Sequence, residues 1–209
     1  IESGPALYLV GDIKKSFPHV PIIYRPSDPV VGYKDSNSSL AKEEKKSLSI
    51  CDQVLVTNRE SIRCFQDKLK INNEAKIHVL KNGVNHKSDC IHRANTTYRD
   101  YDFCYIGGHA PCWSTIVNLC LSQPSREVLI VCPSKPNLYW KIKIKQCSNL
   151  TFQDGVESDK VVPLLKASKV VIVPYKKHFS RMPIGLHGKI LQALLCKRPV
   201  VAQNLILET

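Results

Sequence analysis

The sequence predicts an α/β protein made of two Rossmann-like lobes, each a parallel sheet covered by helices. Apolar runs suited to buried strands alternate with helix-like segments along most of the 209 residues, which is typical of doubly wound sheets. The alternation stops once, at residues 84–100, where the sequence is polar and aperiodic. With 43% apolar residues, the chain can bury one sizeable core or two modest ones.

Before this break, the sequence predicts the second part of an N-terminal lobe over residues 1–85, followed by an interdomain linker over residues 86–100. The predicted strands are VPIIYRP (20–26), DQVLVTN (52–58) and KIHVL (76–80). The predicted helices are SLAKEEKKSLSI (39–50), with Ser38 or Ser39 as its cap, and RESIRCFQDKL (59–69).

After the break, the alternation restarts and predicts a second lobe over residues 101–209. Its strands are expected at residues 101–108, 127–132, 149–155, 169–175 and 198–203, and its helices near 112–122, 138–147, 157–168 and 187–196. We expect both lobes to be incomplete, because the chain opens without a Met and closes directly after a strand-like run.

The net charge of +12 permits an anionic partner: nucleic acid, a membrane leaflet or a phosphorylated metabolite. Nucleic acid is the weakest of these, because the lysines are scattered and aromatic residues are not interleaved with them. A basic face that is merely solvated is the open alternative. No apolar run approaches the roughly 20 residues that a membrane-spanning helix needs.

The nine cysteines predict reduced thiols in a cytosolic protein, because their number is odd and no CxxC pair occurs. Four of them lie inside apolar runs, where a thiol acts as a small hydrophobic group: Cys104, Cys120, Cys132 and Cys196. No metal site is predicted, because neither Cys nor His clusters at zinc-ligand spacing.

The helix-like segment HGKILQALLCKR places Lys189 in its first turn, where the helix dipole is already positive. A cation there costs about 0.3 to 1 kcal/mol, which a bound anion would reverse. Gly185 and Gly188 allow backbone amides to approach a ligand closely. The pattern therefore predicts a phosphate site, with an exposed lysine beside a glycine turn as the open alternative.

Two further features follow predicted strands directly, where open parallel sheets bind ligands. Gly107 and Gly108 come after DFCYI, and Tyr175 comes after KVVIVP. A tyrosine there can pack against a base or a ribose. The basic loop that follows it can meet a second anion, through Lys176, Lys177, His178 and Arg181.

The order and spacing of KIHVLKNGV, YDFCYIGG, NLTFQDGVESDKVVPLLKASKVVIVPY and GKILQALLCKRPVVA resemble the GT-B glycosyltransferases. The resemblance covers most of the chain and implies two Rossmann-like lobes facing a cleft. Many retaining enzymes of this superfamily carry paired glutamates near the last of these helices. Ile184 and Gln192 stand at those positions here, which disfavours ordinary retaining chemistry.

Lys189, Gln192 and Tyr175 are together similar to residues of the GumK-like glucuronosyltransferases that hold the UDP part of UDP-glucuronate. The resemblance implies that Lys189 binds the diphosphate, that Gln192 reaches the ribose or the diphosphate, and that Tyr175 borders the nucleotide. Arg181 or Lys176 is assigned to the uronate carboxylate on charge alone. No cofactor and no metal are implied, because the nucleotide sugar is the substrate.

GumK-like enzymes invert the anomeric centre, which requires a general base on the first lobe. Asp28, directly after the strand-like PIIY, is the candidate, and Glu60, after QVLVTN, is the rival. The alternative for Asp28 is a simple turn, because Asp before Pro often starts one.

The resemblance implies a glycosyltransferase that moves a sugar, glucuronate as the best candidate, from a UDP-sugar to a saccharide or lipid-diphosphate-linked acceptor. Such an enzyme is expected in the cytoplasm, with a peripheral contact to the anionic inner face of the membrane. The alternatives are a retaining hexosyltransferase, a sugar-nucleotide epimerase of the same fold, an inactive relative, and a basic non-catalytic module that binds nucleic acid or membrane.

Overall fold

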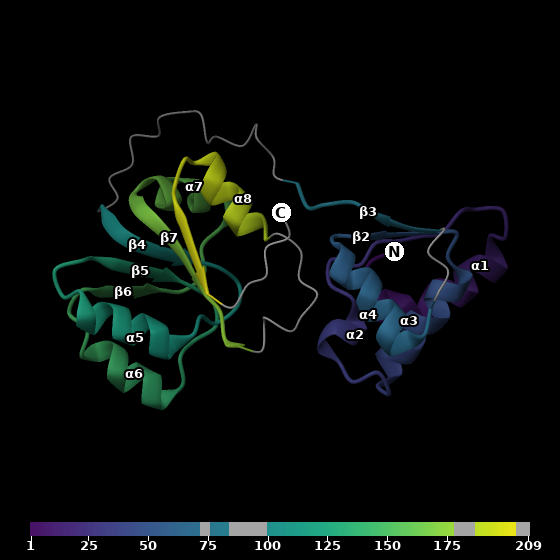
Figure 1. Cartoon of the computed structure of the whole chain (residues 1–209), viewed down its shortest axis with the longest axis horizontal. Coiled ribbons are helices and arrows are strands. Elements are labelled where there is room, and N and C mark those ends of the chain that lie inside the picture. The colour runs from purple at the N-terminus through teal and green to yellow at the C-terminus, as the bar shows by residue number, and fades with distance from the viewer. Residues whose placement is uncertain (72–75, 84–99, 178–186, 204–209) are drawn as a thin grey trace. The chain divides into compact units, whose positions relative to one another are not determined.

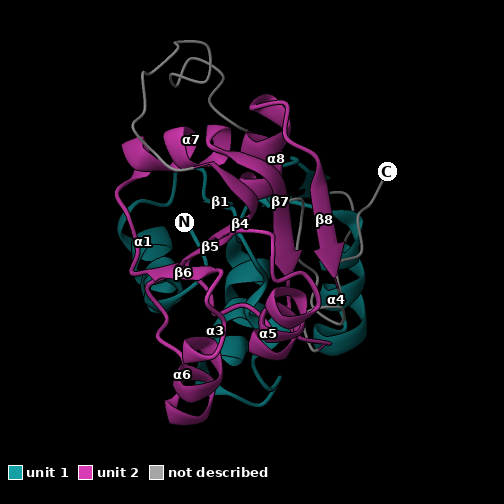
Figure 2. Ribbon diagram, turned by 90° about the vertical axis from the view of Figure 1, so that its left-hand side faces the viewer, with its two compact units in different colours: residues 1–82, 181–187, 207–209 teal, residues 83–180, 188–206 magenta. Residues whose placement is uncertain are grey.

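The computed structural model describes residues 1–71, 76–83, 100–177 and 187–203 and divides the chain into two compact units. Unit 1 consists mainly of residues 1–82, and unit 2 mainly of residues 83–180 and 188–206 (Figure 2). Residues 84–99 lie outside the described residues, and they include all of the predicted linker 86–100 except residue 100.

Unit 1 contains a three-stranded parallel sheet in the order β1-β2-β3. Its strands are β1 (Ile23–Tyr24), β2 (Gln53–Val56) and β3 (Ile77–Val79). Its helices are η1 (Pro5–Leu9), α1 (Val10–Ser16), α2 (Val30–Tyr33), α3 (Ser39–Ile50) and α4 (Arg59–Leu69). Helices α2, α3 and α4 lie on one side of the sheet (Figure 1).

The two longer helices of unit 1 begin at side-chain caps, which satisfy amides that the first turn leaves unpaired. The Ser38 hydroxyl accepts a hydrogen bond from the amide of Ala41, and the Asn58 side chain accepts one from the amide of Ser61. Helices α3 and α4 match the predicted ranges 39–50 and 59–69 residue for residue.

Unit 2 contains a five-stranded parallel sheet in the order β6-β5-β4-β7-β8. Its strands are β4 (Tyr101–Ile106), β5 (Val128–Val131), β6 (Leu150–Gln153), β7 (Ser168–Pro174) and β8 (Val200–Gln203). Its helices are α5 (Trp113–Ser122), α6 (Leu138–Lys145), α7 (Ser158–Lys166) and α8 (Gly188–Leu195).

Helices α5 and α6 cover one face of this sheet, and α7 and α8 cover the other (Figure 1). Strand β5 is buried along its whole length, as expected for a parallel strand covered on both faces. The four cysteines predicted to act as small hydrophobic groups are all buried: Cys104, Cys120, Cys132 and Cys196.

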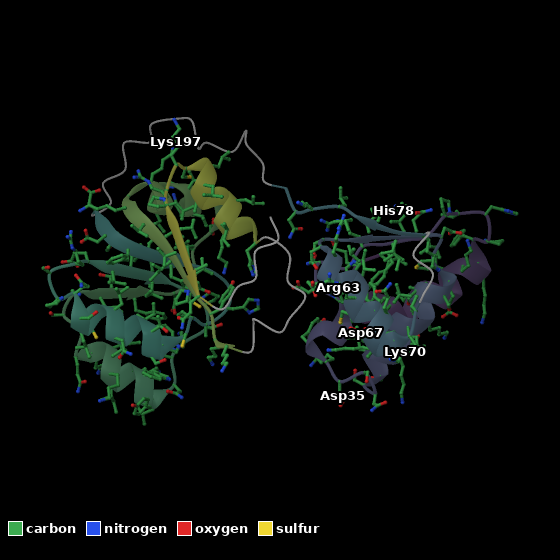
Figure 3. The ribbon with its side chains drawn as sticks, in the orientation of Figure 1. Asp35, Arg63, Asp67, Lys70, His78 and Lys197 are labelled. Carbon is green, nitrogen blue, oxygen red and sulfur yellow. The ribbon has the colours of Figure 1, made fainter. Side chains whose placement is uncertain are left out.

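Helices α4 and α8 are each followed by a lysine in the left-handed region, Lys70 with φ 57° and Lys197 with φ 56° (Figure 3). After α8, the amide of Lys197 donates to the carbonyl of Leu194, and the amide of Arg198 donates to the carbonyl of Ala193. This pairing closes the helix before Pro199, which cannot continue it.

The sequence prediction missed η1, α1 and α2, and it made the first strand too long. Strand β1 covers two residues of the predicted 20–26, because Pro21 and Pro26 flank it and proline has no amide to donate to a sheet. Helix α2 has four residues, which is too short to show a helical period. Among the described residues, no helix combines the length and the apolar character needed to cross a membrane.

Candidate functional site

The strand order of unit 2 reverses between β4 and β7, which lie side by side in the sheet. Open α/β sheets bind ligands beyond the carboxyl ends of their strands at such a switch point. Gly107 follows β4 directly and Tyr175 follows β7 directly. The amide of Cys112 donates to the carbonyl of Pro174 at 2.6 Å, which holds the two strand ends together. Two of the predicted site residues therefore lie at the switch point.

Lys189, in the first turn of α8, places its ammonium group between two tyrosine rings at this switch point. Its Nζ atom lies 5.0 Å from the ring centroid of Tyr105 and 4.8 Å from that of Tyr175. It also donates a hydrogen bond to the Tyr175 hydroxyl at 2.5 Å. Both tyrosines are fully buried, so the two rings form fixed walls for the cation.

Among the described residues, no acidic side chain neutralises the charge of the Lys189 ammonium. Burial lowers its pKa from the ordinary 10.5 to about 8. No Asp or Glu within the described residues forms an ion pair with it. A partly desolvated cation without a counter-ion is stabilised when an anion binds beside it.

The loop after β4 is held in place by three side chains beneath it. The Tyr105 hydroxyl donates to the carbonyl of His109 at 2.6 Å, and the Cys132 thiol donates to the same carbonyl at 3.1 Å. The Ser134 hydroxyl donates to the carbonyl of Gly108 at 3.1 Å. Burial raises the pKa of Tyr105, so its phenol stays neutral and continues to donate.

Gly107 is required by this packing. A Cβ atom there would lie 2.5 Å from Nζ of Lys189 and 2.7 Å from the Tyr105 hydroxyl, closer than real contacts allow. At Gly108 an added Cβ would meet nothing within 4 Å. The two adjacent glycines therefore differ: only the first is needed for the close approach of loop, lysine and tyrosine.

Tyr105 and Cys132 were not predicted as site residues. Both lie at the ends of strand-like apolar runs, where they look like core residues. Tyr105 and Gly107 stand two positions apart along an extended segment, so they point to the same side. A tyrosine two residues before a strand-end glycine is the signal that was available in the sequence.

The structure describes only some of the residues predicted in α8 and in the segment that precedes it. Gln192 lies half-buried in α8, three positions after Lys189. Gly188 opens α8, and an added Cβ there would meet nothing within 4 Å. Arg181 and Ile184 lie outside the described residues.

In unit 1, Asp28 is exposed in the loop that follows β1. The Thr57 hydroxyl, beyond the end of β2, donates to the carbonyl of Ser27 at 3.4 Å. Asp28 therefore lies near the carboxyl end of the sheet, as the sequence predicted. The rival Glu60, in the first turn of α4, forms an ion pair with Arg63, which Figure 3 labels on that helix.

Residues 1–57 match the sequence family described as "Glucuronosyltransferase GumK, N-terminal domain". This match includes Asp28 and ends at Thr57. No curated protein matches the chain.

Three solved structures share the fold of the chain. Anabaena HepE, solved in complex with UDP-glucose, has a TM-score of 0.64 and 16% identity, over 94% of this chain and 57% of its own. WaaG, a glycosyltransferase involved in lipopolysaccharide biosynthesis, has a TM-score of 0.59 and 15% identity, over 92% of this chain and 62% of its own. AviGT4, a glycosyltransferase involved in avilamycin A biosynthesis, has a TM-score of 0.57 and 9% identity, over 92% of this chain and 58% of its own.

These matches confirm the predicted fold: the chain has the two-unit α/β fold of the GT-B glycosyltransferases. It spans about three-fifths of the length of the structures that it matches. The likeness to these structures shows the fold, and the GumK match is confined to residues 1–57.

Proposed function

We propose that this chain, which has the GT-B fold, belongs to a glycosyltransferase that uses a UDP-sugar donor. The observation that supports this most directly is the Lys189 ammonium, which is partly buried at the switch point of the unit 2 sheet and has no acidic partner among the described residues. The pyrophosphate of a nucleotide sugar supplies the negative charge that this ammonium lacks. The structural neighbour HepE was solved with UDP-glucose, which favours uridine as the nucleoside.

Glucuronate is the sugar that we propose for the donor. The match of residues 1–57 to the GumK N-terminal domain supports it, as do the pairing of Lys189 with Gln192 and the basic residues after β7. Lys189 and Gln192 then bind the UDP part, Tyr175 borders the nucleotide, and Arg181 or Lys176 binds the uronate carboxylate.

The reaction we propose inverts the anomeric centre and uses no metal. Asp28 removes the proton of the acceptor hydroxyl while the oxygen of that hydroxyl attacks the anomeric carbon and UDP leaves. Lys189 stabilises the negative charge that develops on the diphosphate, a form of preorganised stabilisation worth several kcal/mol. The acceptor is a saccharide or a lipid-diphosphate-linked oligosaccharide.

A thermal-shift panel of UDP, GDP, UDP-glucose and UDP-glucuronate with the intact protein tests the donor. We expect UDP and its sugars to raise the melting temperature, and UDP-glucuronate to raise it most, because a ligand that binds the folded state stabilises it. A shift with GDP alone contradicts the choice of donor. No shift with any nucleotide, combined with salt-sensitive DNA binding, favours the non-catalytic module instead.

Gly107→Ala is expected to weaken UDP binding about tenfold, because the added methyl group displaces the Lys189 ammonium and the Tyr105 hydroxyl from their present positions. Isothermal titration calorimetry with UDP measures the change. Gly108→Ala is the matched control, since its methyl group enters open space. Equal affinity of the two variants would contradict a nucleotide site at the end of β4.

A peripheral membrane contact at the cytoplasmic face is the last part of the proposal, and α6 supports it. Three large apolar residues on this helix are strongly exposed: Leu138 at 73%, Tyr139 at 58% and Ile142 at 54%. Ile142 lies four positions after Leu138 and three after Tyr139, so the three side chains share one side of the helix. The helix carries three lysines and no acidic residue: Lys141, Lys143 and Lys145. Apolar insertion beside basic residues is typical of binding to anionic lipid.

The double variant Lys141→Glu/Lys145→Glu is expected to weaken binding to vesicles that contain anionic lipid by at least about thirtyfold, at about 1 kcal/mol for each lysine. Co-sedimentation with phosphatidylcholine vesicles, with and without phosphatidylglycerol, measures it. Lys42→Glu/Lys45→Glu on α3 makes the same charge change on another exposed helix face. If the two double variants weaken vesicle binding equally, the binding depends on net charge rather than on α6.

A further inference from the structure

Glu44, in the middle of α3, is a fully buried carboxylate that accepts three hydrogen bonds. Its Oε1 accepts from the Tyr24 hydroxyl at 2.6 Å and from the amide of Val30 at 2.8 Å. Its Oε2 accepts from the amide of Val31 at 3.0 Å. All four residues are buried completely, so no water competes for these bonds.

The partners of Glu44 lie on the two sides of the segment that carries Asp28. Tyr24 is the last residue of β1, and Val30 and Val31 are the first residues of α2. The intervening residues 25–29 form the loop in which Asp28 is exposed. One carboxylate therefore fixes both ends of this loop, through a side chain at its start and the backbone at its end.

This arrangement is energetically costly for the fold. Burial raises the pKa of Glu44, and the three hydrogen bonds only partly oppose that effect. Within the described residues, no Lys or Arg forms an ion pair with it. Apolar residues often stabilise such a core position as well or better, so stability alone does not account for a buried charge here.

Tyr33, at the end of α2, is influenced by both carboxylates. Burial, and then the negative charges of Glu44 and Asp28, raise the pKa of its hydroxyl. The first two residues of the same helix, Val30 and Val31, are bonded to the Glu44 carboxylate. Lys68 of α4 also holds this helix, by donating to the carbonyl of Val31 at 2.7 Å.

Asp52 offers a useful contrast within the same unit. Its carboxylate also accepts a backbone hydrogen bond, from the amide of Ile22 at 2.7 Å at the amino end of β1. It is partly exposed, and Lys14 neutralises it with an ion pair at 3.1 Å. A carboxylate that only fastens a strand can therefore stay at the surface and be paired.

We propose that Glu44 is a positioning residue that holds the Asp28 loop in the geometry needed for proton abstraction. The inference rests on the proposed role of Asp28 as the general base. Glu44 does not touch the substrate and acts through the loop alone. A misplacement of about 1 Å at a reacting group can lower a rate by up to about a hundredfold, so a rigid support for this loop has a direct effect on turnover.

Glu44→Gln is expected to lower kcat about tenfold and to leave UDP affinity unchanged, because the amide keeps the volume but cannot accept all three hydrogen bonds. Tyr24→Phe removes one donor, keeps the carboxylate, and is expected to show a smaller decrease. Asp52→Asn is the matched control and is expected to leave kcat unchanged. Circular dichroism measures whether each variant is folded. If Glu44→Gln does not fold, Tyr24→Phe tests the inference in its place.

A double-variant cycle separates positioning from general destabilisation. If Glu44 acts through Asp28, Glu44→Gln has no further effect on the residual rate of Asp28→Asn. An equal decrease in both backgrounds, or an unchanged kcat for Glu44→Gln and Tyr24→Phe, overturns the inference while Asp28 keeps its role. Full activity of Asp28→Asn itself overturns the proposed base, which is a different failure.

Discussion

Lys189→Met is expected to weaken UDP binding by about ten- to a hundredfold while making the empty protein more stable. The methionine keeps the length and the packing of the side chain but removes the ammonium, and charge-assisted hydrogen bonds contribute about 1.5 to 3 kcal/mol each. Stability increases because the variant removes a partly buried charge that no described acidic side chain neutralises. Calorimetric titration with UDP and thermal melting without ligand measure the two effects.

The titration of Lys189 predicts that both stability and UDP affinity depend on pH. Its pKa in the folded protein, about 8, lies below the ordinary 10.5, so the unfolded chain binds the extra proton between these values. The contribution of this group to stability is therefore present above pH 10.5 and is lost as the pH falls through about 8. UDP affinity is expected to change in the opposite direction, falling as the pH rises above 8. Both dependences should disappear in Lys189→Met.

Lys197→Met is the control for this variant. Lys197 lies just beyond α8 and is exposed, so its replacement makes the same chemical change on the same segment without touching the tyrosine rings (Figure 3). We expect its UDP affinity and melting temperature to stay close to those of the parent. Unchanged UDP binding in Lys189→Met would contradict the assignment of the diphosphate to Lys189. The proposed donor site would then lose its main support.

The regular part of the fold was predictable because local signals and burial agree. Helices α3 and α4 carry polar caps and a helical period, and both match their predicted bounds. Helices α1 and α2 are short and lie beside glycine or proline, so no period indicates them. Strand β1 was overestimated because its apolar composition concealed the limits that Pro21 and Pro26 set.

The candidate site was predictable where a residue conflicts with its local environment. Lys189 stands at the positive end of a helix, and Tyr175 and Gly107 stand directly after strands. Tyr105 and Glu44 both fit their local sequence, so neither stands out as a site residue. Tyr105 completes a strand pattern, and Glu44 belongs to a polar helix. Their roles depend on contacts between segments that are distant along the chain, and those contacts appear only in three dimensions.

Asp28→Asn is expected to lower kcat by about a hundred- to ten-thousandfold, the usual contribution of a general base. The amide has nearly the same shape as the carboxylate but cannot take the acceptor proton. Steady-state kinetics with UDP-glucuronate and a saccharide acceptor in the intact enzyme measure the decrease. UDP affinity should be unaffected, because the proposed nucleotide contacts all come from unit 2.

Glu60→Gln decides between the two candidate acids. The Glu60 carboxylate already forms an ion pair with Arg63 and lies in the first turn of α4, where a negative charge stabilises the helix. Its replacement should therefore reduce stability slightly and leave kcat within about twofold of the parent, because surface ion pairs contribute little. A large decrease in kcat for Glu60→Gln, with Asp28→Asn nearly active, would move the base from the loop after β1 to the start of α4. The lower kcat of Asp28→Asn is the expected result because Asp28, unlike Glu60, lies in an exposed loop that a buried carboxylate fixes at both ends.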